Sequence, residues 1–188
     1  DQCQEIYFSW MEEFLDLTQN CVGYSPPVAA RTFFYIGISN YEAISESYDE
    51  MHTLSKQLEG FDRKVWLQNE KIHYPHLVNC LNKELAYLFF PGMAPSNRKK
   101  VDKKFADNLL VYNKTISRRE MKQTKEYAVR LVQEIFTYSQ SDGGHEGFRR
   151  NFPASYVAPI HEGCWERTYP GYTSALLPFW GGNRLSVP

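Results

Sequence analysis

The stretch SPPVAARTFFYIGISNYEAI, residues 25–44, decides the fold of this chain. Ser25 stands where a helix N-cap is expected, and the two prolines after it cost no hydrogen bond, because the first N–H groups of a helix have no partner inside it. The apolar residues that follow are too many for one helix face, which is typical of a helix surrounded by others. Gly37 would let a neighbouring helix approach the backbone closely. We therefore predict a central helix over about residues 27–48.

Four further segments carry apolar residues at helical spacing and predict helices packed around this one. Ser117 and Glu120 form a capping box that opens the last of them, and Gly143 or Gly144 ends it in the left-handed conformation. A short helix at about 50–59 is an additional candidate. The four segments are residues 4–19, 76–90, about 97–113 (with Ser96 as its cap) and about 118–140.

Residues 145–188 differ in character from the rest of the chain. Prolines and glycines interrupt every candidate helix there, so this segment cannot bury itself and must wrap over the helices or lead into something else. We predict an all-α fold. It consists of a helical bundle of about five or six helices over residues 1–144 and an irregular, Pro/Gly-rich C-terminal arm over residues 145–188.

The composition is that of a globular domain with a core of large rings. Hydrophobic residues make up 43% of the 188 residues and aromatic residues 15%. The 21 basic residues nearly balance the 22 acidic ones, which argues against electrostatic binding of nucleic acid. The basic run at residues 97–105 is therefore interpreted as a solvated helix face. No apolar run approaches the roughly 20 residues that a membrane span needs.

The four cysteines are far apart and form no CxxC pair, which does not suggest a zinc site. We interpret them as buried or incidental thiols. One disulfide, for example between Cys3 and Cys21, is an alternative if the protein is exported.

Three pieces of the sequence, in order, resemble the N-terminal half of the vanadium-dependent haloperoxidases and their relatives in the phosphatidic acid phosphatase (PAP2) superfamily. The first is residues 25–44, with its prolines and its Ala-Ala-Arg step. The second is SQSDGG, residues 139–144. The third is GCWERTYPGYTSALLPFWGGNRLSV, residues 163–187, where the similarity is carried by Trp165, Thr168, Pro170, Pro178, Trp180 and Gly181.

That family holds a vanadate or phosphoryl group with a lysine, two arginines, a serine, a glycine amide and histidines, since a highly charged oxyanion needs several fixed donors and an apical imidazole. These groups lie in three motifs of its C-terminal half: a lysine followed by Arg-Pro, a Ser-Gly-His, and an arginine followed by histidine. None is found here: Arg184 precedes Leu185, and His145 follows two glycines without a serine. The resemblance therefore implies no catalytic or cofactor-binding residue in this chain, and vanadate in a complete parent protein.

Arg31 lies in the most apolar predicted helix, where a charged side chain needs a partner. We predict a structural salt bridge, for example to Glu42 or Asp142. The alternative is a cationic wall near an anion site that a missing domain completes. The arm would shape the same pocket through four aromatic residues: Trp165, Tyr169, Tyr172 and Trp180.

Several histidines offer weaker candidates. A metal site at His73 and His76 is disfavoured because Pro75 breaks the helical spacing and no third ligand is evident, so we predict a turn with exposed histidines. Two histidines each precede a glutamate, which resembles an acid–base pair but is common by chance. They are His145–Glu146 and His161–Glu162, and a small enzyme built on the second pair is our weakest hypothesis.

Two functions remain. The first is a scaffold portion of a haloperoxidase- or phosphatase-like protein, whose partner is a C-terminal catalytic helical domain or a second chain carrying it. The second is a non-catalytic helical binding module, and a homo-oligomer is a further option. The surface of Phe33, Phe34 and Tyr41 separates them, because half a protein leaves it uncovered. Bacterial relatives imply a periplasmic or envelope location, with the cytoplasm as the alternative.

Overall fold

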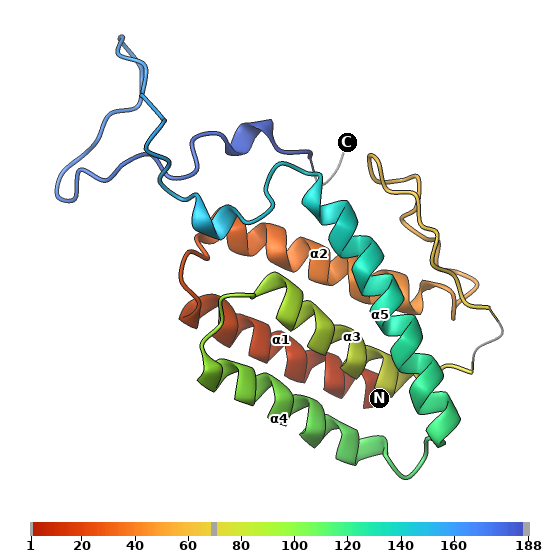
Figure 1. Ribbon diagram of the computed structural model, residues 1–188. Coiled ribbons are helices and arrows are strands. Elements are labelled where there is room, and N and C mark those ends of the chain that lie inside the picture. The colour runs from red at the N-terminus through yellow and green to blue at the C-terminus, as the bar shows by residue number, and fades with distance from the viewer. Residues whose placement is uncertain (1, 69–70, 186–188) are drawn as a thin grey trace.

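The computed structural model describes residues 2–68 and 71–185, and these residues form helices, turns and loops without a strand (Figure 1). The five α-helices are α1 (Gln2–Asn20), α2 (Pro26–Ser45), α3 (Tyr74–Phe89), α4 (Pro95–Tyr112) and α5 (Arg118–Gln140). Two short 3₁₀ helices, η1 (Gly147–Arg149) and η2 (Trp180–Gly182), lie in the arm. The predicted all-α fold is confirmed. None of the described helices has the length and apolar content of a membrane span.

The centre of the bundle is α3, which packs against α1, α2, α4 and α5 (Figure 1). Its side chains are buried around most of the helix, including Leu77, Leu81 and Leu85. From α1, the rings of Trp10 and Phe14 are fully buried against it. The large rings expected from the composition therefore do form part of the core.

The prediction that α2 is the central helix is wrong. This helix packs against α3 and α5, and its side away from them is only partly covered. A Cβ atom placed on Gly37 would meet no heavy atom within 4 Å, so this glycine does not serve a close helix approach here. The partly covered side is an apolar stripe at helical spacing, called the α2 stripe below: Ala30, Phe33, Phe34, Gly37, Tyr41 and Ile44.

Helix ends follow local side-chain chemistry. The predicted capping box at the start of α5 is formed, with Ser117 and Glu120 each accepting from the other's backbone N–H. Gly143 has the positive φ of 87° expected after the end of this helix. Ser96 is not a cap, because α4 begins one residue earlier and its N-cap is Ala94.

The helix predicted at residues 50–59 is absent, and turns take its place. Polar contacts compete with the helical hydrogen bonds: the Glu42 carboxylate accepts from the Thr53 hydroxyl at 2.8 Å and from the Leu54 N–H at 2.5 Å. Lys56 has a φ of 64°, which is outside the right-handed helical region. The connection between α2 and α3 is therefore an irregular segment pinned to α2.

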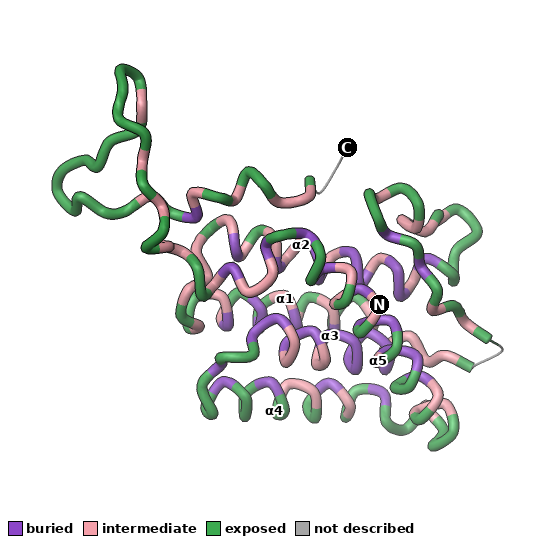
Figure 2. Tube along the Cα trace, turned by 45° about the horizontal axis from the view of Figure 1, so that its top comes forward, coloured by how far each residue is buried: buried purple, intermediate pink, exposed green. Residues whose placement is uncertain are grey.

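The arm has two ends packed on the helices and a loop that projects away from them (Figure 1). Residues 142–152 and 177–185 form the packed ends, and residues 153–176, called the arm loop below, project. The ends meet where the Leu177 N–H donates to the Asn151 carbonyl oxygen at 2.7 Å. Figure 2 shows the arm loop as mostly exposed. The two ends of the arm thus lie on the helices, and the arm loop between these ends projects away from them.

Candidate functional site

Asp142 follows α5, where the arm meets the bundle, and charged and polar groups contact it there. Arg31 of α2 donates from Nε to Oδ2 at 2.6 Å and from Nη2 to Oδ1 at 3.1 Å, a bidentate pairing. Its Nη2 also donates to the carbonyl oxygen of Ser139 at 2.5 Å. Of the two partners expected from the sequence, Arg31 therefore binds Asp142, and Glu42 has another role.

Other donors complete this arrangement, called the Asp142 cluster below. The Tyr35 hydroxyl donates to Oδ2 at 2.9 Å and the Gly144 N–H to Oδ1 at 2.7 Å. The backbone N–H of Arg184 donates to the Asp142 carbonyl oxygen at 2.8 Å. Burial, followed by the Asp142 charge, raises the pKa of Tyr35 to about 12, so this hydroxyl stays neutral and donates.

The Arg184 guanidinium closes the cluster from the arm side. It lies 3.8 Å over the Tyr138 ring and donates to the Tyr138 carbonyl oxygen at 3.0 Å. It also donates to the hydroxyls of Tyr35 and Ser141, each at 3.1 Å. The Arg31 guanidinium therefore pairs with the Asp142 carboxylate and the Arg184 guanidinium with the Tyr35 hydroxyl beside it, so both are directed at acceptors of the protein itself.

The residues of the Asp142 cluster do not fit vanadate or phosphate. The Arg31 guanidinium is paired with a carboxylate that would repel an anion, and Arg184 donates to hydroxyl and carbonyl oxygens. A small cavity of about 190 Å³ lies beside the cluster, and neither a histidine nor a lysine is among the residues that line it. An oxyanion site needs several uncommitted donors and an imidazole, so the cluster is a structural junction.

The four aromatic residues expected to shape a pocket are split between the two parts of the arm. Trp180 in η2 packs closely on Gly147, whose Cβ would lie 2.9 Å from the indole ring, and it lines the same small cavity as Arg31. Trp165, Tyr169 and Tyr172 lie on the arm loop and are exposed. The structure therefore brings Trp180 and Arg31 together and leaves the other three in solvent.

A second buried ion pair holds the connection between α2 and α3. Arg63 Nη1 lies 2.7 Å from Glu42 Oε2, and both side chains are fully buried. The same guanidinium pairs with Glu46 and donates to the Tyr127 hydroxyl at 2.7 Å. Sequence reasoning missed Arg63 because the segment around it has no periodicity. The available signal was Glu42, a carboxylate on an apolar helix that needs a cation.

His76 is buried in α3, so the prediction of a turn with exposed histidines is wrong at this position. Its Nδ1 lies 2.9 Å from the Tyr112 hydroxyl, and its Nε2 lies 3.3 Å from Cys80 Sγ. Burial lowers the pKa of His76 to about 4 and raises that of Cys80 to about 12, so both groups are neutral. His73 accepts from the His76 N–H and caps α3.

The remaining candidates bring no catalytic pair or metal site together. The His145 ring packs edge-on against Phe136, and the imidazole of His161 contacts Cys164 and the backbone carbonyl oxygen of Glu162, so neither ring is paired with the carboxylate of the glutamate that follows it. Within residues 2–68 and 71–185, no group of three or more His, Cys, Asp or Glu side chains is placed to hold a metal ion.

All four cysteines lie in the described residues and are thiols. The alternative of a Cys3–Cys21 disulfide is wrong, because the two residues lie at opposite ends of α1. At 1.5 Å per residue their backbones are about 27 Å apart, whereas a disulfide requires less than about 7 Å between Cα atoms.

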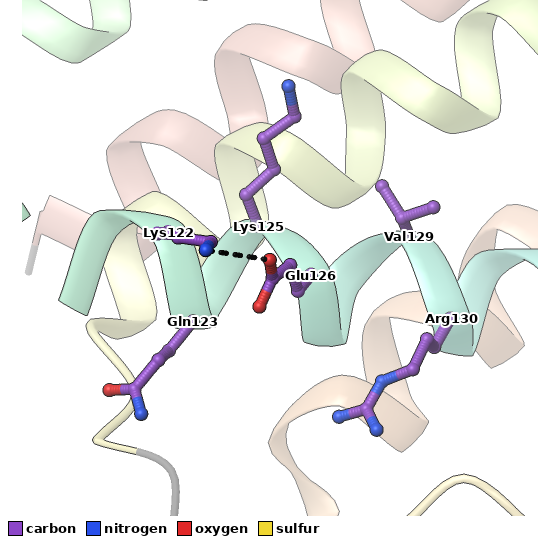
Figure 3. A pocket seen from close by; sticks show the side chains of 6 residues that line it. All are labelled: Lys122, Gln123, Lys125, Glu126, Val129 and Arg130. Atoms are coloured by element: carbon purple, nitrogen blue, oxygen red, sulfur yellow. Dashed lines mark ion pairs between the residues drawn. The ribbon is translucent and has the colours of Figure 1, made fainter. Parts of the chain in front are cut away.

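A hollow of about 660 Å³ on the surface of α5 lacks the features of a ligand site (Figure 3). The polar contact drawn in Figure 3 is the exposed ion pair between Lys122 Nζ and Glu126 Oε1, which are 3.8 Å apart. Ligand sites are concave and combine polar groups that converge on one point. All lining residues of this hollow belong to one helix: Lys122, Gln123, Lys125, Glu126, Val129 and Arg130.

The α2 stripe continues into a wider groove of about 690 Å³, where α2 meets the first turns of α1 and α3. Tyr41 and Ile44 of the stripe line it together with Tyr7, Tyr48 and Tyr74. Apolar and aromatic side chains dominate this groove. At the other end of the stripe, Ala30 and Phe34 line the small cavity next to Trp180 and Arg184 of the arm. The stripe is therefore partly covered by the arm at one end and borders this groove at the other.

Comparisons with known proteins give a match in structure. No protein-family model matches the chain, and no curated protein matches it. Among solved structures, the crystal structure of a bacterial vanadium-dependent iodoperoxidase superposes on the chain with a TM-score of 0.78 and 20% sequence identity. The chain has a haloperoxidase fold. The superposition covers 98% of this chain and 42% of that one, so the chain spans less than half the length of the iodoperoxidase.

Proposed function

We propose that this chain is the helical N-terminal scaffold of a vanadium-haloperoxidase-like protein, and that a further helical part carries the oxyanion site. The supporting observation is the asymmetry of the superposition, which covers nearly all of this chain and 42% of the iodoperoxidase. The lack of fit between vanadate and the Asp142 cluster agrees with a site elsewhere. By analogy the parent reaction is halide oxidation by peroxide. Phosphomonoester hydrolysis, which the resemblance also implies, is the alternative, and we propose the periplasm or cell envelope as the location.

In this proposal the α2 stripe is the surface that receives the catalytic part. Phe33, Phe34 and Tyr41 are each half-buried and stand on the same side of the helix. Gly37 between them leaves room for a packed helix, since nothing lies within 4 Å of its added Cβ. A partner with apolar helices would bury this surface, which a free-standing domain has little reason to present.

Labelling at Gly37 tests the scaffold assignment. Gly37→Cys, with peptide-resolved maleimide labelling, should react quickly in the isolated 188-residue chain and at least tenfold more slowly in the full protein of the natural source. Leu110→Cys on α4, whose leucine is 69% exposed, is the matched control that should react equally in both. Equal labelling of Gly37→Cys in the two samples would show that the stripe is not covered.

An activity measurement separates scaffold from enzyme. With orthovanadate, iodide and hydrogen peroxide, the isolated chain should form no triiodide above the protein-free rate, and the full protein should. Turnover by the isolated chain would place the catalytic groups within it and overturn the proposal.

A second function, a binding module without catalysis, is favoured by the arm loop. Trp165, Tyr169 and Tyr172 are exposed there, and such rings are common anchors in recognition surfaces. This function would be preferred if the natural protein extends no further than this chain and Gly37→Cys stays reactive in it.

A further inference from the structure

Helix α4 and the first half of α5 carry a concentration of basic residues that the near-zero net charge of the whole chain conceals. Residues 95–130 contain 11 Lys and Arg against 4 Asp and Glu, whereas the rest of the chain contains 10 against 18. One of the four acids, Asp102, pairs with Lys83 of α3, which lies outside this segment. The charge of the chain is therefore strongly divided, and one part of the bundle is cationic.

Several of these cations are not explained by contacts within the chain. Lys99, Lys114, Arg118 and Arg119 are exposed, and none of them forms an ion pair with a residue that the structure describes. Arg118 and Arg119 occupy the first turn of α5, where the helix dipole favours an anion and disfavours a cation. Neither arginine therefore stabilises the helix that carries it, and an external anion would relieve the repulsion.

The exposed side of α4 combines the same charges with aliphatic side chains. Lys99, Lys103 and Leu110 share this side by their spacing, opposite the buried Val101. Leu110 is 69% exposed, and the adjacent Val111 is 51% exposed. Lysines interspersed with aliphatic residues are typical of a helix that lies on an anionic membrane: the aliphatic side chains enter the headgroup region, and the lysines extend their ammonium groups toward lipid phosphates.

The aromatic residues of this segment favour a lipid surface over a nucleic acid. Proteins that bind single strands without sequence preference present exposed rings on which bases stack. The aromatic residues of segment 95–130 are Phe105, which is half-buried, and Tyr112 and Tyr127, which are fully buried. A lipid surface needs cations and aliphatic side chains but no such rings.

We propose that the exposed side of α4 and the start of α5, called the basic face below, bind a membrane surface of anionic phospholipid. Leu110 enters the headgroup region, and the unpaired cations are attracted to the lipid phosphates. Figure 1 shows α4 on the far side of α1 and α3 from α2. A partner on the α2 stripe would therefore leave the basic face open, so this inference does not depend on the proposed function.

Co-sedimentation with lipid vesicles tests the proposal. The chain should partition about tenfold or more strongly to phosphatidylcholine vesicles with about 30% phosphatidylglycerol than to phosphatidylcholine alone, and about 0.5 M salt should remove most of this difference. Equal partition to the two kinds of vesicle would overturn the proposal. Binding to a single-stranded oligonucleotide without binding to the anionic vesicles would also overturn it, in favour of a nucleic-acid partner.

A pair of double variants separates the basic face from the overall charge. Arg118→Gln with Arg119→Gln should weaken partition to the anionic vesicles about tenfold or more, since each cation near such a surface contributes roughly fivefold. Removing cations from a helix N-terminus should not unfold α5. Lys56→Gln with Lys64→Gln, two exposed residues between α2 and α3, removes the same charge and should change partition less than about twofold. An equal loss in both double variants would contradict the proposal.

A pair of leucine variants tests the apolar contribution. Leu110→Ser should weaken partition to the anionic vesicles about fivefold or more, because the serine cannot bury aliphatic surface among the headgroups. Leu185→Ser on the arm, whose leucine is 72% exposed, is the matched control and should leave partition unchanged. Circular dichroism verifies that the bundle is intact in each variant. Unchanged partition of Leu110→Ser would contradict the proposal.

Discussion

The bundle and the arm loop contain the same pair of residue types in different surroundings. In α3, His76 and Cys80 lie 3.3 Å apart with both side chains buried, and in the arm loop His161 and Cys164 lie 3.0 Å apart in contact with solvent. In the core, desolvation keeps the imidazole and the thiol neutral, so the pair contributes packing and hydrogen bonding. The same pair of residue types thus forms part of the core in one place and of a solvent-facing turn in the other.

Aromatic residues repeat this contrast. Trp10 and Phe14 are fully buried in α1, whereas Tyr169 of the arm loop is 82% exposed. Burying a large ring removes well over 100 Å² from water, so the rings of the bundle contribute strongly to its stability. The rings of the arm loop contribute little to folding. Substitutions in the two regions should therefore differ in their effect on the free energy of unfolding.

The largest effect is expected at the buried ion pair of the bundle. Arg63→Met should lower the free energy of unfolding by about 3–5 kcal/mol, because Glu42 is left buried without its cation. Urea denaturation measures the change. Tyr169→Ser on the arm loop is the comparison and should change the free energy by less than about 0.5 kcal/mol.

Removing the charge of Glu42 tests whether the unpaired carboxylate causes this loss of stability. Adding Glu42→Gln to Arg63→Met should recover part of the lost stability, since an uncharged amide is less costly to bury than an unpaired carboxylate. If the double variant is no more stable than Arg63→Met, the loss comes from packing rather than from the orphaned charge.

A smaller, pH-dependent effect is expected from His76. Its pKa is lowered from 6.5 to about 4 by burial, so the unfolded chain binds more protons between these two values. Stability should therefore be complete above about pH 6.5 and fall as the pH drops toward 4, by about 3 kcal/mol at most. Urea denaturation from pH 7 to 4.5 measures the slope.

Two histidine variants test whether His76 causes this dependence of stability on pH. His76→Gln should flatten the dependence on pH even if it lowers stability at pH 7. His161→Gln, on the exposed arm loop, is the matched control and should keep the wild-type slope. A wild-type slope in His76→Gln would contradict the assignment.

The smallest effect concerns the α2 stripe. Gly37→Ala should stabilise the isolated chain by about 1 kcal/mol, because alanine favours a helix and its Cβ meets open space. Thermal or urea denaturation measures the gain. In a longer protein in which a helix packs on this side, the gain should shrink or reverse. An equal gain in both would argue against coverage of the stripe.

Much of the fold can be predicted from the sequence because local rules govern it. The capping box at Ser117, the glycine after α5 and the apolar spacing of the helices all act over a few residues. The predictions that are wrong concern features that depend on contacts between residues far apart in the sequence. The segment at 50–59 is kept from helix by the Glu42 carboxylate, and α3 rather than α2 is central because of how five helices share the available surface.

The junction at Asp142 was partly predictable for the same reason. A charged residue on an apolar helix demands a partner, which identifies Arg31 and limits its choice to nearby carboxylates. Arg184 and Arg63 come from segments without periodicity, so nothing local indicated that their side chains would reach Tyr138 and Glu42. Likewise, the His161–Cys164 contact depends on the geometry of a turn. Gly163 permits this turn, but a glycine alone does not predict it.

The joined ends of the arm loop have a consequence for how the chain tolerates change. Asn151 and Leu177 are hydrogen-bonded to each other, so residues 153–176 form a closed appendage whose ends are held independently of its contents. The entropy of closing such a loop grows only with the logarithm of its length, so doubling it costs roughly 0.6 kcal/mol. A proteolytic cut there should leave the terminal segment attached through Arg184. The loop is thus a place where length and sequence can vary while the bundle stays folded.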